Sequence, residues 1–332
     1  MTESLPPPGL YERLLQALHR HRFLLALLSF AAGMASFVLI QRQDWLAQPI
    51  ALFLLLSWLG ILLEPALARR RLPPTLLRFG VQAVHQETFF FALPFFYATT
   101  TWTTPQAFFT AALSVAGVAA LWDPLYHGRI AGQRGLYLVF HGVASFVATL
   151  VALPIILHLD TGQSLGLATV VMLLVAVSAS VQRLDSTRPW HWAAVLGGGV
   201  LLGALAVLAR PWIPPATLWV EDAMITAAVD KETRDPDLRL VSISAAQLHG
   251  DGVFAWTAIH APRGLQERVF HRWLLEGEEV DRIALEISGG REQGYRAWSY
   301  KKGFPADPRG SWTIQVITEG GQLIGQFEFA AR

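Results

Sequence analysis

The sequence predicts a seven-span α-helical membrane bundle followed by a C-terminal antiparallel β-sandwich of immunoglobulin-like size. The chain of 332 residues has a mean hydropathy of +0.38 and only 15% charged residues, which is too apolar for an ordinary soluble protein. Long apolar runs fill its first two-thirds, whereas its last third alternates polar and apolar residues. The balance of charge changes at the same point. Residues 1–210 carry 13 Lys or Arg and 8 Asp or Glu, whereas residues 211–332 carry 13 Lys or Arg and 17 Asp or Glu.

The predicted spans follow from the thickness of a bilayer. Its hydrocarbon is about 30 Å thick and a helix rises about 1.5 Å per residue, so a span needs roughly 17 to 25 apolar residues. We therefore predict an N-terminal cytoplasmic segment 1–22, a transmembrane domain 23–210, a linker 211–217 and a sandwich domain 218–332. The apolar runs that meet the length requirement are 23–40, 46–63, 79–98, 106–122, 136–157, 164–181 and 191–209.

The first run follows basic residues, as the apolar core of a secretory signal does. Its length and the runs that come after it favour a retained helix over a cleaved signal. The sequence thus predicts that the N-terminus stays attached to the membrane domain.

Arginines predict the orientation of the chain. With the N-terminus in the cytoplasm, eleven arginines fall in inside segments and only Arg42 and Arg210 fall outside, which satisfies the positive-inside rule. An odd number of spans then places the tail outside, so we predict a bacterial inner-membrane protein with a periplasmic C-terminal domain. The chain has no cysteine, which excludes disulfides and Cys-ligated zinc. The inside arginines are Arg13, Arg20, Arg22, Arg69, Arg70, Arg71, Arg78, Arg129, Arg134, Arg183 and Arg188.

The period of the sequence changes from helical to two near Leu218. In residues 312–316 apolar and polar residues alternate, as a half-buried strand requires. The pattern repeats in residues 323–329 after the pair Gly320 and Gly321, which predicts a hairpin. Several short strands in about 115 residues are typical of a sandwich. The further expected strands are 223–229, 238–244, 252–260, 268–275, 282–287 and 294–301.

Short motifs in both halves resemble families of unknown function. The tail carries His271-Arg272-Trp273, then Tyr295-Arg296-Ala297-Trp298-Ser299, Gly310-Ser311-Trp312 and a closing run from Gly321 to Phe329, and it resembles a C-terminal bacterial domain of unknown function. Upstream, His85-Gln86-Glu87 and Asp123-Pro124-Leu125-Tyr126 resemble the membrane domain of uncharacterised inner-membrane proteins that bear this tail. The resemblance implies the two-domain architecture and no activity.

Two strands of the predicted sandwich carry candidate binding residues. His271 and Trp273 share one face of a strand, and Arg296, Trp298 and Tyr300 share one face of another. Aromatic rings beside a guanidinium suit a glycan, a lipid headgroup or a peptide. The alternative is that the tryptophans fill the core and Arg296 is a structural donor.

Polar residues inside the predicted spans form a second candidate site. Gln82, His85 and Gln86 lie on one face of a helix, whereas Glu87 lies about 200° around the helix from His85. His85 and His141 fall at similar depths toward the cytoplasmic side. Ionisable groups at bilayer depth are functional candidates because they are costly to bury. The full set is Glu64, Gln82, His85, Gln86, Glu87, Asp123, His127 and His141.

Three interpretations of this set stay open. His85 and His141 with Glu87 or Asp123 supply ligand types for zinc, although no cofactor is required by any motif. His85 and Glu87 are suited to a proton or solute path. Hydrogen bonds between neighbouring helices explain the same residues without a further function.

Composition also limits the partners. The acidic tail argues against nucleic acid, and no phosphate loop or nucleophile elbow occurs. Gly199 with Gly203, and Ala32 with Ser36, predict close helix contacts within the bundle or between copies in a homo-oligomer.

The sequence therefore supports two hypotheses of function. In the first, a membrane protein presents a periplasmic sandwich that binds an envelope glycan, a lipid headgroup or a protein partner, without catalysis. In the second, a membrane enzyme or transporter uses the cytoplasm-proximal His, Glu and Asp residues.

Overall fold

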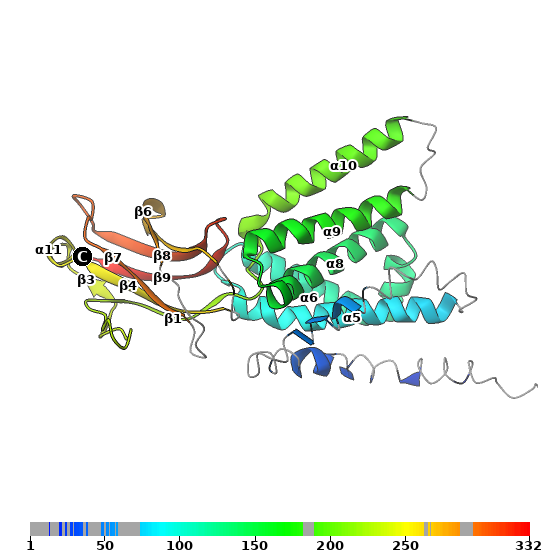
Figure 1. Cartoon of the computed structure of the whole chain (residues 1–332), viewed down its shortest axis with the longest axis horizontal. Helices are drawn as coiled ribbons and strands as arrows, with labels where there is room; N and C mark the ends of the chain where they lie inside the picture. Colours follow the sequence, from blue (N-terminus) through cyan, green and yellow to red (C-terminus); the bar gives the residue numbers. More distant parts are fainter. Residues whose placement is uncertain are drawn as a thin grey trace, which may run out of the picture.

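The computed structural model describes residues 74–181, 189–261, 267–285 and 295–332, together with residue 265 and scattered residues between 13 and 58. Figure 1 shows a bundle of helices with a two-sheet β-domain at one end. We call the helices and their connections within residues 74–212 the helical domain, and residues 219–331 the sandwich. The expected spans 23–40 and 46–63 are only partly described, and the residue Glu64 lies outside the described residues.

The helices of the helical domain run up and down between the sandwich and the opposite end. In Figure 1, α5, α6, α8 and α9 lie together, and α10 follows α9 at the edge of the bundle. The elements are α5 (Pro74–Thr99), α6 (Gln106–Leu121), α7 (Asp123–Leu125), the π-helix η1 (Tyr126–Ile130), α8 (Arg134–Leu157), α9 (Thr161–Val181), α10 (Pro189–Leu208) and the 3₁₀-helix η2 (Arg210–Trp212).

The prediction of seven spans is wrong. Within the described residues, only the stretch 135–157 of α8 is long and apolar enough to cross a membrane, and the bent pair of α6 with α7 and η1 adds at most one more. α5 contains the expected span 79–98, but its polar residues near position 85 lower its hydropathy. α6 turns by 92° into α7 and η1. The apolar parts of α9 and α10 cover only residues 161–177 and 192–208.

Pro94 shapes the packing of α5. It lies inside the helix and has no N–H to donate to the carbonyl of Phe90 four residues earlier. Gly33 approaches this carbonyl so closely that a Cβ on Gly33 would lie 2.5 Å from the oxygen. The missing side chain of Gly33 thus permits a tight contact at the point where Pro94 interrupts the hydrogen bonds of α5.

The predicted C-terminal β-sandwich is confirmed. One sheet has the strand order β2-β1-β4-β7 and the other β3-β9-β8-β5-β6, with all pairs antiparallel except β3 and β9. The elements are β1 (Trp219–Thr226), β2 (Arg239–Leu240), β3 (Ser242–Ile243), α11 (Ala245–Gly250), β4 (Val253–His260), β5 (Val269–Leu275), β6 (Glu278–Ala284), β7 (Tyr295–Lys301), β8 (Gly310–Thr318) and β9 (Leu323–Ala331).

Large aromatic side chains fill the space between the sheets. Trp273 and Trp312 are fully buried, and their rings meet edge to face with centroids 6.3 Å apart. Phe329 stacks on Trp312 at 5.9 Å. Elsewhere the sheets approach closely at Gly325 of β9, where a Cβ would lie only 2.7 Å from Cγ2 of Val220 in β1. The missing side chain of Gly325 permits this approach. Burial of these rings supplies much of the apolar driving force for the sandwich.

Candidate functional site

Two histidines and a tyrosine form a hydrogen-bonded chain inside the helical domain. His85 of α5 is fully buried, and its Nδ1 lies 2.8 Å from the hydroxyl of Tyr126 in η1. Its Nε2 lies 2.9 Å from Nδ1 of His141 in α8. Tyr126 and His141 are buried as well. These three side chains, which we call the histidine chain, therefore join three separate elements.

Two glutamines on the polar face of α5 form hydrogen bonds to residues at the break between α6 and α7. Nε2 of Gln82 donates to the carbonyl of Ala120 at 3.0 Å and to Oδ1 of Asp123 at 2.9 Å. Nε2 of Gln86 donates to the same carbonyl at 2.8 Å. The helical spacing that places Gln82, His85 and Gln86 on one side thus aims two amides at the end of α6 and the imidazole at η1.

An aromatic shell encloses the histidine chain. The ring of Tyr137 stacks on His141 with centroids 5.7 Å apart and an interplanar angle of 13°. The ring of Trp58 lies 4.9 Å from His141, and the ring of Phe140 meets His85 edge to face at 5.3 Å. This shell makes a lasting charge on either imidazole costly.

The hydrogen bonds of the histidine chain are suited to proton transfer. A neutral imidazole has one N–H donor and one acceptor nitrogen, so each ring can accept a proton on one side and release one on the other. Histidine is the side chain best suited to such shuttling near neutral pH. The arrangement can therefore pass a proton between Tyr126 and His141 while both rings return to the neutral form.

The remaining candidates from the sequence do not join this chain. Glu87 is half-buried on another side of α5. His127 packs its ring against Phe79 at 5.8 Å and Tyr126 at 5.3 Å. Among the residues that the structure describes, no group of three His, Asp or Glu side chains lies close enough to hold a metal. The two histidines considered as zinc ligands instead direct nitrogens at each other.

The roles of Tyr126, Tyr137 and Trp58 were not predicted from the sequence. Tyr126 belongs to the motif Asp123-Pro124-Leu125-Tyr126, but nothing in that motif shows that a π-helix follows it and turns the phenol toward His85. Trp58 lies in a run of apolar residues that gives no sign of a polar contact, yet its Nε1 donates to Oγ1 of Thr88 at 3.0 Å. These roles depend on contacts between elements that are distant in the sequence.

In the sandwich, His271 and Trp273 lie in the core. Nδ1 of His271 lies 2.8 Å from Oγ of Ser299 and its Nε2 lies 3.1 Å from Oγ1 of Thr257. Nε1 of Trp273 donates to the same Ser299 hydroxyl at 3.2 Å. Burial lowers the pKa of His271 to about 3. Both residues have no exposed surface and serve the contact between the two sheets.

Arg296, Trp298 and Tyr300 lie on the outer face of the sheet formed by β2, β1, β4 and β7. Arg296 forms an ion pair with Asp235 and donates to the carbonyl of Thr233 at 3.3 Å. Tyr300 is 44% exposed, and its hydroxyl donates to the carbonyl of Asp251 at 2.7 Å. The structure therefore brings these three predicted residues to one outward surface.

Aromatic side chains of β4 extend that surface. The ring of Phe254 lies 4.6 Å from that of Tyr300, and Trp256 is the cross-strand partner of Trp298. Nε1 of Trp256 donates to the carbonyl of Arg234 at 2.9 Å, so the segment after β1 lies over part of the sheet. We call the outward side chains Phe254, Arg296, Trp298 and Tyr300 the aromatic face.

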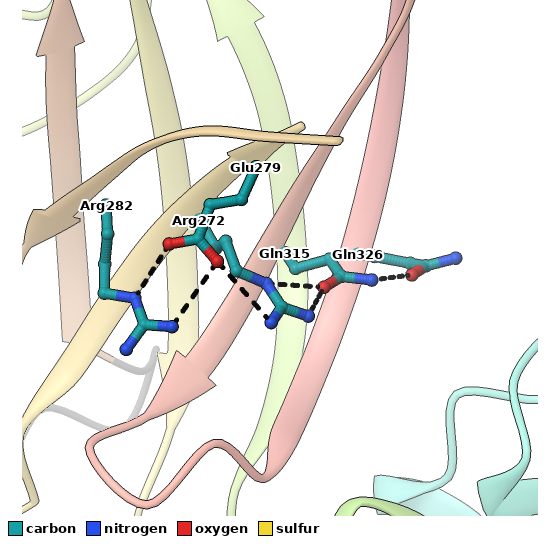
Figure 2. A network of polar contacts seen from close by, with 5 residues as sticks. All are labelled: Arg272, Glu279, Arg282, Gln315 and Gln326. Atoms are coloured by element: carbon teal, nitrogen blue, oxygen red, sulfur yellow. Dashed lines mark hydrogen bonds and ion pairs between the residues drawn. The ribbon is translucent and has the colours of Figure 1, made fainter. Parts of the chain in front are cut away.

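The opposite sheet carries a polar ladder that the sequence analysis did not identify. Figure 2 shows its five side chains crossing β9, β8, β5 and β6. Nε2 of Gln315 donates to Oε1 of Gln326 at 3.0 Å, and Nε of Arg272 donates to Oε1 of Gln315 at 3.0 Å. Glu279 lies 3.8 Å from Arg272 and 3.3 Å from Arg282. Alternation predicts that such residues point outward, but only the strand register makes them neighbours.

Comparisons with known proteins divide the chain into two regions, each matching a family of unknown function. Residues 8–255 match the model of a family of unknown function (DUF5924), and the chain belongs to this family. Residues 266–330 match a protein of unknown function (DUF2914). No curated protein and no solved structure matches the chain.

The boundary between the two matches falls inside the sandwich. The first match ends in β4 and the second begins just before β5. The two family regions therefore each contribute strands to one folded unit.

Proposed function

We propose that this protein is an envelope membrane protein whose helical domain lies in the bilayer and holds the sandwich at the membrane surface as a binding module. The observation that carries the proposal is the apolar outer surface of the helices. In α10 alone, Val200 is 73% exposed and Leu208 is 74% exposed. Soluble monomers rarely expose continuous apolar surface of this extent. The further exposed side chains are Phe108, Val115, Val118, Val170, Leu174, Leu196, Leu201, Leu205 and Val207.

Exposed tryptophans at the two ends of the helices support a bilayer location. Exposed Trp102 follows α5 and exposed Trp212 ends η2, at the helix ends that face the sandwich, whereas exposed Trp122 follows α6 and exposed Trp190 lies at the start of α10, at the opposite helix ends. Tryptophan is enriched at both membrane interfaces.

Basic residues support an outward orientation of the sandwich. Arg78, Arg129 and Arg134 lie at or near the helix ends far from the sandwich, whereas Arg210 lies beside it. The positive-inside rule assigns the arginine-rich side to the cytoplasm. The sandwich is then periplasmic in a Gram-negative cell, where its ligand is a component of the envelope.

Cysteine labelling tests both location and orientation, because the chain has no cysteine of its own. Leu238 and Val200 have matched exposure, 78% and 73%, but only Val200 is predicted to face lipid. In spheroplasts, a membrane-impermeant maleimide should label Leu238→Cys, label Arg78→Cys only after lysis, and leave Val200→Cys unlabelled until detergent is added. Equal labelling of Val200→Cys and Leu238→Cys would refute a lipid-covered α10, and the reverse pattern for Arg78 and Leu238 would refute the orientation.

The histidine chain favours a second candidate function, proton transfer within the helical domain. The observation is the unbroken series of hydrogen bonds from Tyr126 through His85 to His141. Tyr126→Phe removes the hydroxyl that bonds His85, and Tyr137→Phe is the matched control because it keeps the ring stacked on His141.

Proton flux into liposomes containing the protein, driven by a potassium diffusion potential and followed with a pH-sensitive dye, measures this function. We expect flux in the wild type and in Tyr137→Phe, and a loss of at least tenfold in Tyr126→Phe. Absence of flux in the wild type, or equal flux in both variants, would reject proton transfer and leave the histidine chain as a structural contact.

A further inference from the structure

A buried polar joint connects the helical domain to the sandwich. Nε2 of Gln106, at the start of α6, donates to the carbonyl of Leu323 at 2.7 Å. Nε2 of Gln322 donates to the carbonyl of Ile213 at 3.1 Å. Both glutamines are almost completely buried. Because buried polar groups bond specifically, these contacts define one docked arrangement of the two domains, visible in Figure 1 where the sandwich meets the helix ends.

Arg210 lies at the centre of this joint. A Cβ on Gly320, in the turn between β8 and β9, would overlap the Arg210 guanidinium, and a Cβ on Gly162 of α9 would lie 3.1 Å from its Nη2. One glycine from each domain thus leaves room for the same cation.

Glu267 of the sandwich caps α9 of the helical domain. Its Oε2 accepts the backbone N–H of Thr161 at 2.6 Å, and its Oε1 accepts the Thr161 hydroxyl at 3.1 Å. Thr161 is the first residue of α9, whose leading N–H groups have no partner within the helix. A carboxyl group from 106 residues further along the chain therefore does the work of a helix cap across the domain boundary.

Charged groups surround Glu267 on several sides. Asp160 precedes α9 and Arg210 approaches from η2, and both act electrostatically on the carboxyl group. On the sandwich side, the neighbouring Arg268 pairs with Glu319 at 3.2 Å. Glu267 thus interacts with one anion and one cation, in a site partly closed to water.

We propose that Glu267 is a proton-controlled latch, which docks the sandwich on the helical domain when protonated and loosens it when ionised. A protonated carboxyl group still accepts the Thr161 N–H through its carbonyl oxygen. An ionised one places a negative charge in the partly buried joint beside Asp160. This latch controls how the two domains are joined and does not depend on the ligand that the sandwich binds.

The pKa of Glu267 agrees with docking at low pH and loosening at higher pH. Burial raises the pKa of Glu267 from 4.5 to about 7, Asp160 adds to the rise, and the Thr161 hydrogen bonds and Arg210 oppose it. A pKa that is higher when docked means that docking binds a proton, so docking is strongest below about pH 4.5 and weakens as the pH rises to about 7. A difference of 2.5 between these values corresponds to at most about a 300-fold change in the docking equilibrium.

Distance measurement between two nitroxide labels tests the latch in the full chain. Leu238→Cys on the sandwich and Val118→Cys on α6 are both exposed, and the chain has no native cysteine to interfere. We expect one narrow distance distribution at pH 5 and a second, displaced population at pH 8 in the wild-type background. With Glu267→Gln, which stays neutral and keeps an acceptor oxygen, the narrow distribution should persist at both pH values.

A second variant distinguishes titration of Glu267 from a purely structural change in the joint. Thr161→Val removes a hydroxyl that stabilises the ionised carboxylate but keeps the backbone N–H, so it should move the midpoint of the distance change to higher pH. An unchanged wild-type distribution from pH 5 to 8, or the same pH response in Glu267→Gln, would overturn the latch. A midpoint that Thr161→Val leaves in place or lowers would overturn the role of this hydrogen bond in it.

Discussion

His271 illustrates how one polar side chain is accommodated in an apolar core. Its ring bonds the hydroxyls of Thr257 and Ser299 from the facing sheet, so both of its nitrogens are satisfied. Burial, however, lowers its pKa from 6.5 to about 3. The histidine is therefore neutral in the folded sandwich under all ordinary conditions, and its function is to join β5 to β4 and β7.

This gives a prediction for the stability of the sandwich. Between about pH 3 and 6.5 the unfolded chain binds a proton on His271 that the folded chain does not, so this contribution is complete above pH 6.5 and is lost as the pH falls toward 3. At about 1.4 kcal/mol per pKa unit, the loss is at most about 5 kcal/mol. Urea unfolding of the full chain in detergent, followed by tryptophan fluorescence, should show a lower midpoint at pH 5 than at pH 7.

His271→Gln is the variant that isolates the effect. Its amide can still bond the two hydroxyls but does not titrate in this range, so we expect a lower midpoint at pH 7 and a weaker dependence on pH. An equally steep dependence in the variant would assign the titration to other groups.

Among the elements, the strands were easier to predict than the helices. β7 spans Tyr295–Lys301 where the alternation predicted 294–301, and β8 and β9 pair across the turn at Gly320 and Gly321. A side-chain period of two is a local property, and it survives in the folded chain because each strand has one face toward the core. The register between strands is not local, so the polar ladder of Figure 2 had no signature in the sequence.

The helices depend on interruptions that hydropathy does not resolve. A run of apolar residues from 106 to 122 gives no warning that the backbone is extended at Trp122 and turns into a π-helix. This interruption is what directs Tyr126 toward His85. The helical spacing of His85 with Gln82 and Gln86 was predictable, whereas the partner of the imidazole depended on the π-helix.

Trp298 in the strand β7 allows ligand binding by the aromatic face to be tested. Trp298 is only half-buried, and it lies on the outward face beside Arg296 and Tyr300, where flat rings suit a sugar or a lipid headgroup. We expect Trp298→Ala to weaken sedimentation of the full chain with purified envelope glycan, or with vesicles of envelope lipid, by at least tenfold. Val241→Ala is the matched control, because Val241 is 72% exposed but lies between β2 and β3, outside the segment that covers part of this sheet.

The fold of the variant decides how this result is interpreted. Circular dichroism should show the same β content for Trp298→Ala as for the wild type. Retained binding to both the glycan and the vesicles would remove the aromatic face from consideration, and a lost β signal would make Trp298 a structural residue.

At the scale of the whole molecule, the joint determines whether the sandwich and the helices act as one unit. The connection between η2 and β1 is short, and Ile213, Ala216 and Leu218 within it are buried. Two buried glutamines and the Glu267 cap hold the domains together. An event at the ligand face can reach the helical domain through these contacts, so the joint is a candidate site of coupling between the two domains.

Gly320 provides a direct test of that coupling, because its missing side chain leaves room for Arg210. Gly320→Ala places a methyl group where the guanidinium lies, so Arg210 must move and the docked arrangement weakens while both domains stay folded. We expect limited proteolysis to cut the connection 213–218 about tenfold faster than in the wild type, equivalent to about 1.4 kcal/mol of lost docking free energy. Gly303→Ala is the matched control, because a Cβ there meets no atom within 4 Å. Equal cleavage of the two variants would mean that Arg210 does not hold the joint, and the docking would then rest on the other contacts between the domains.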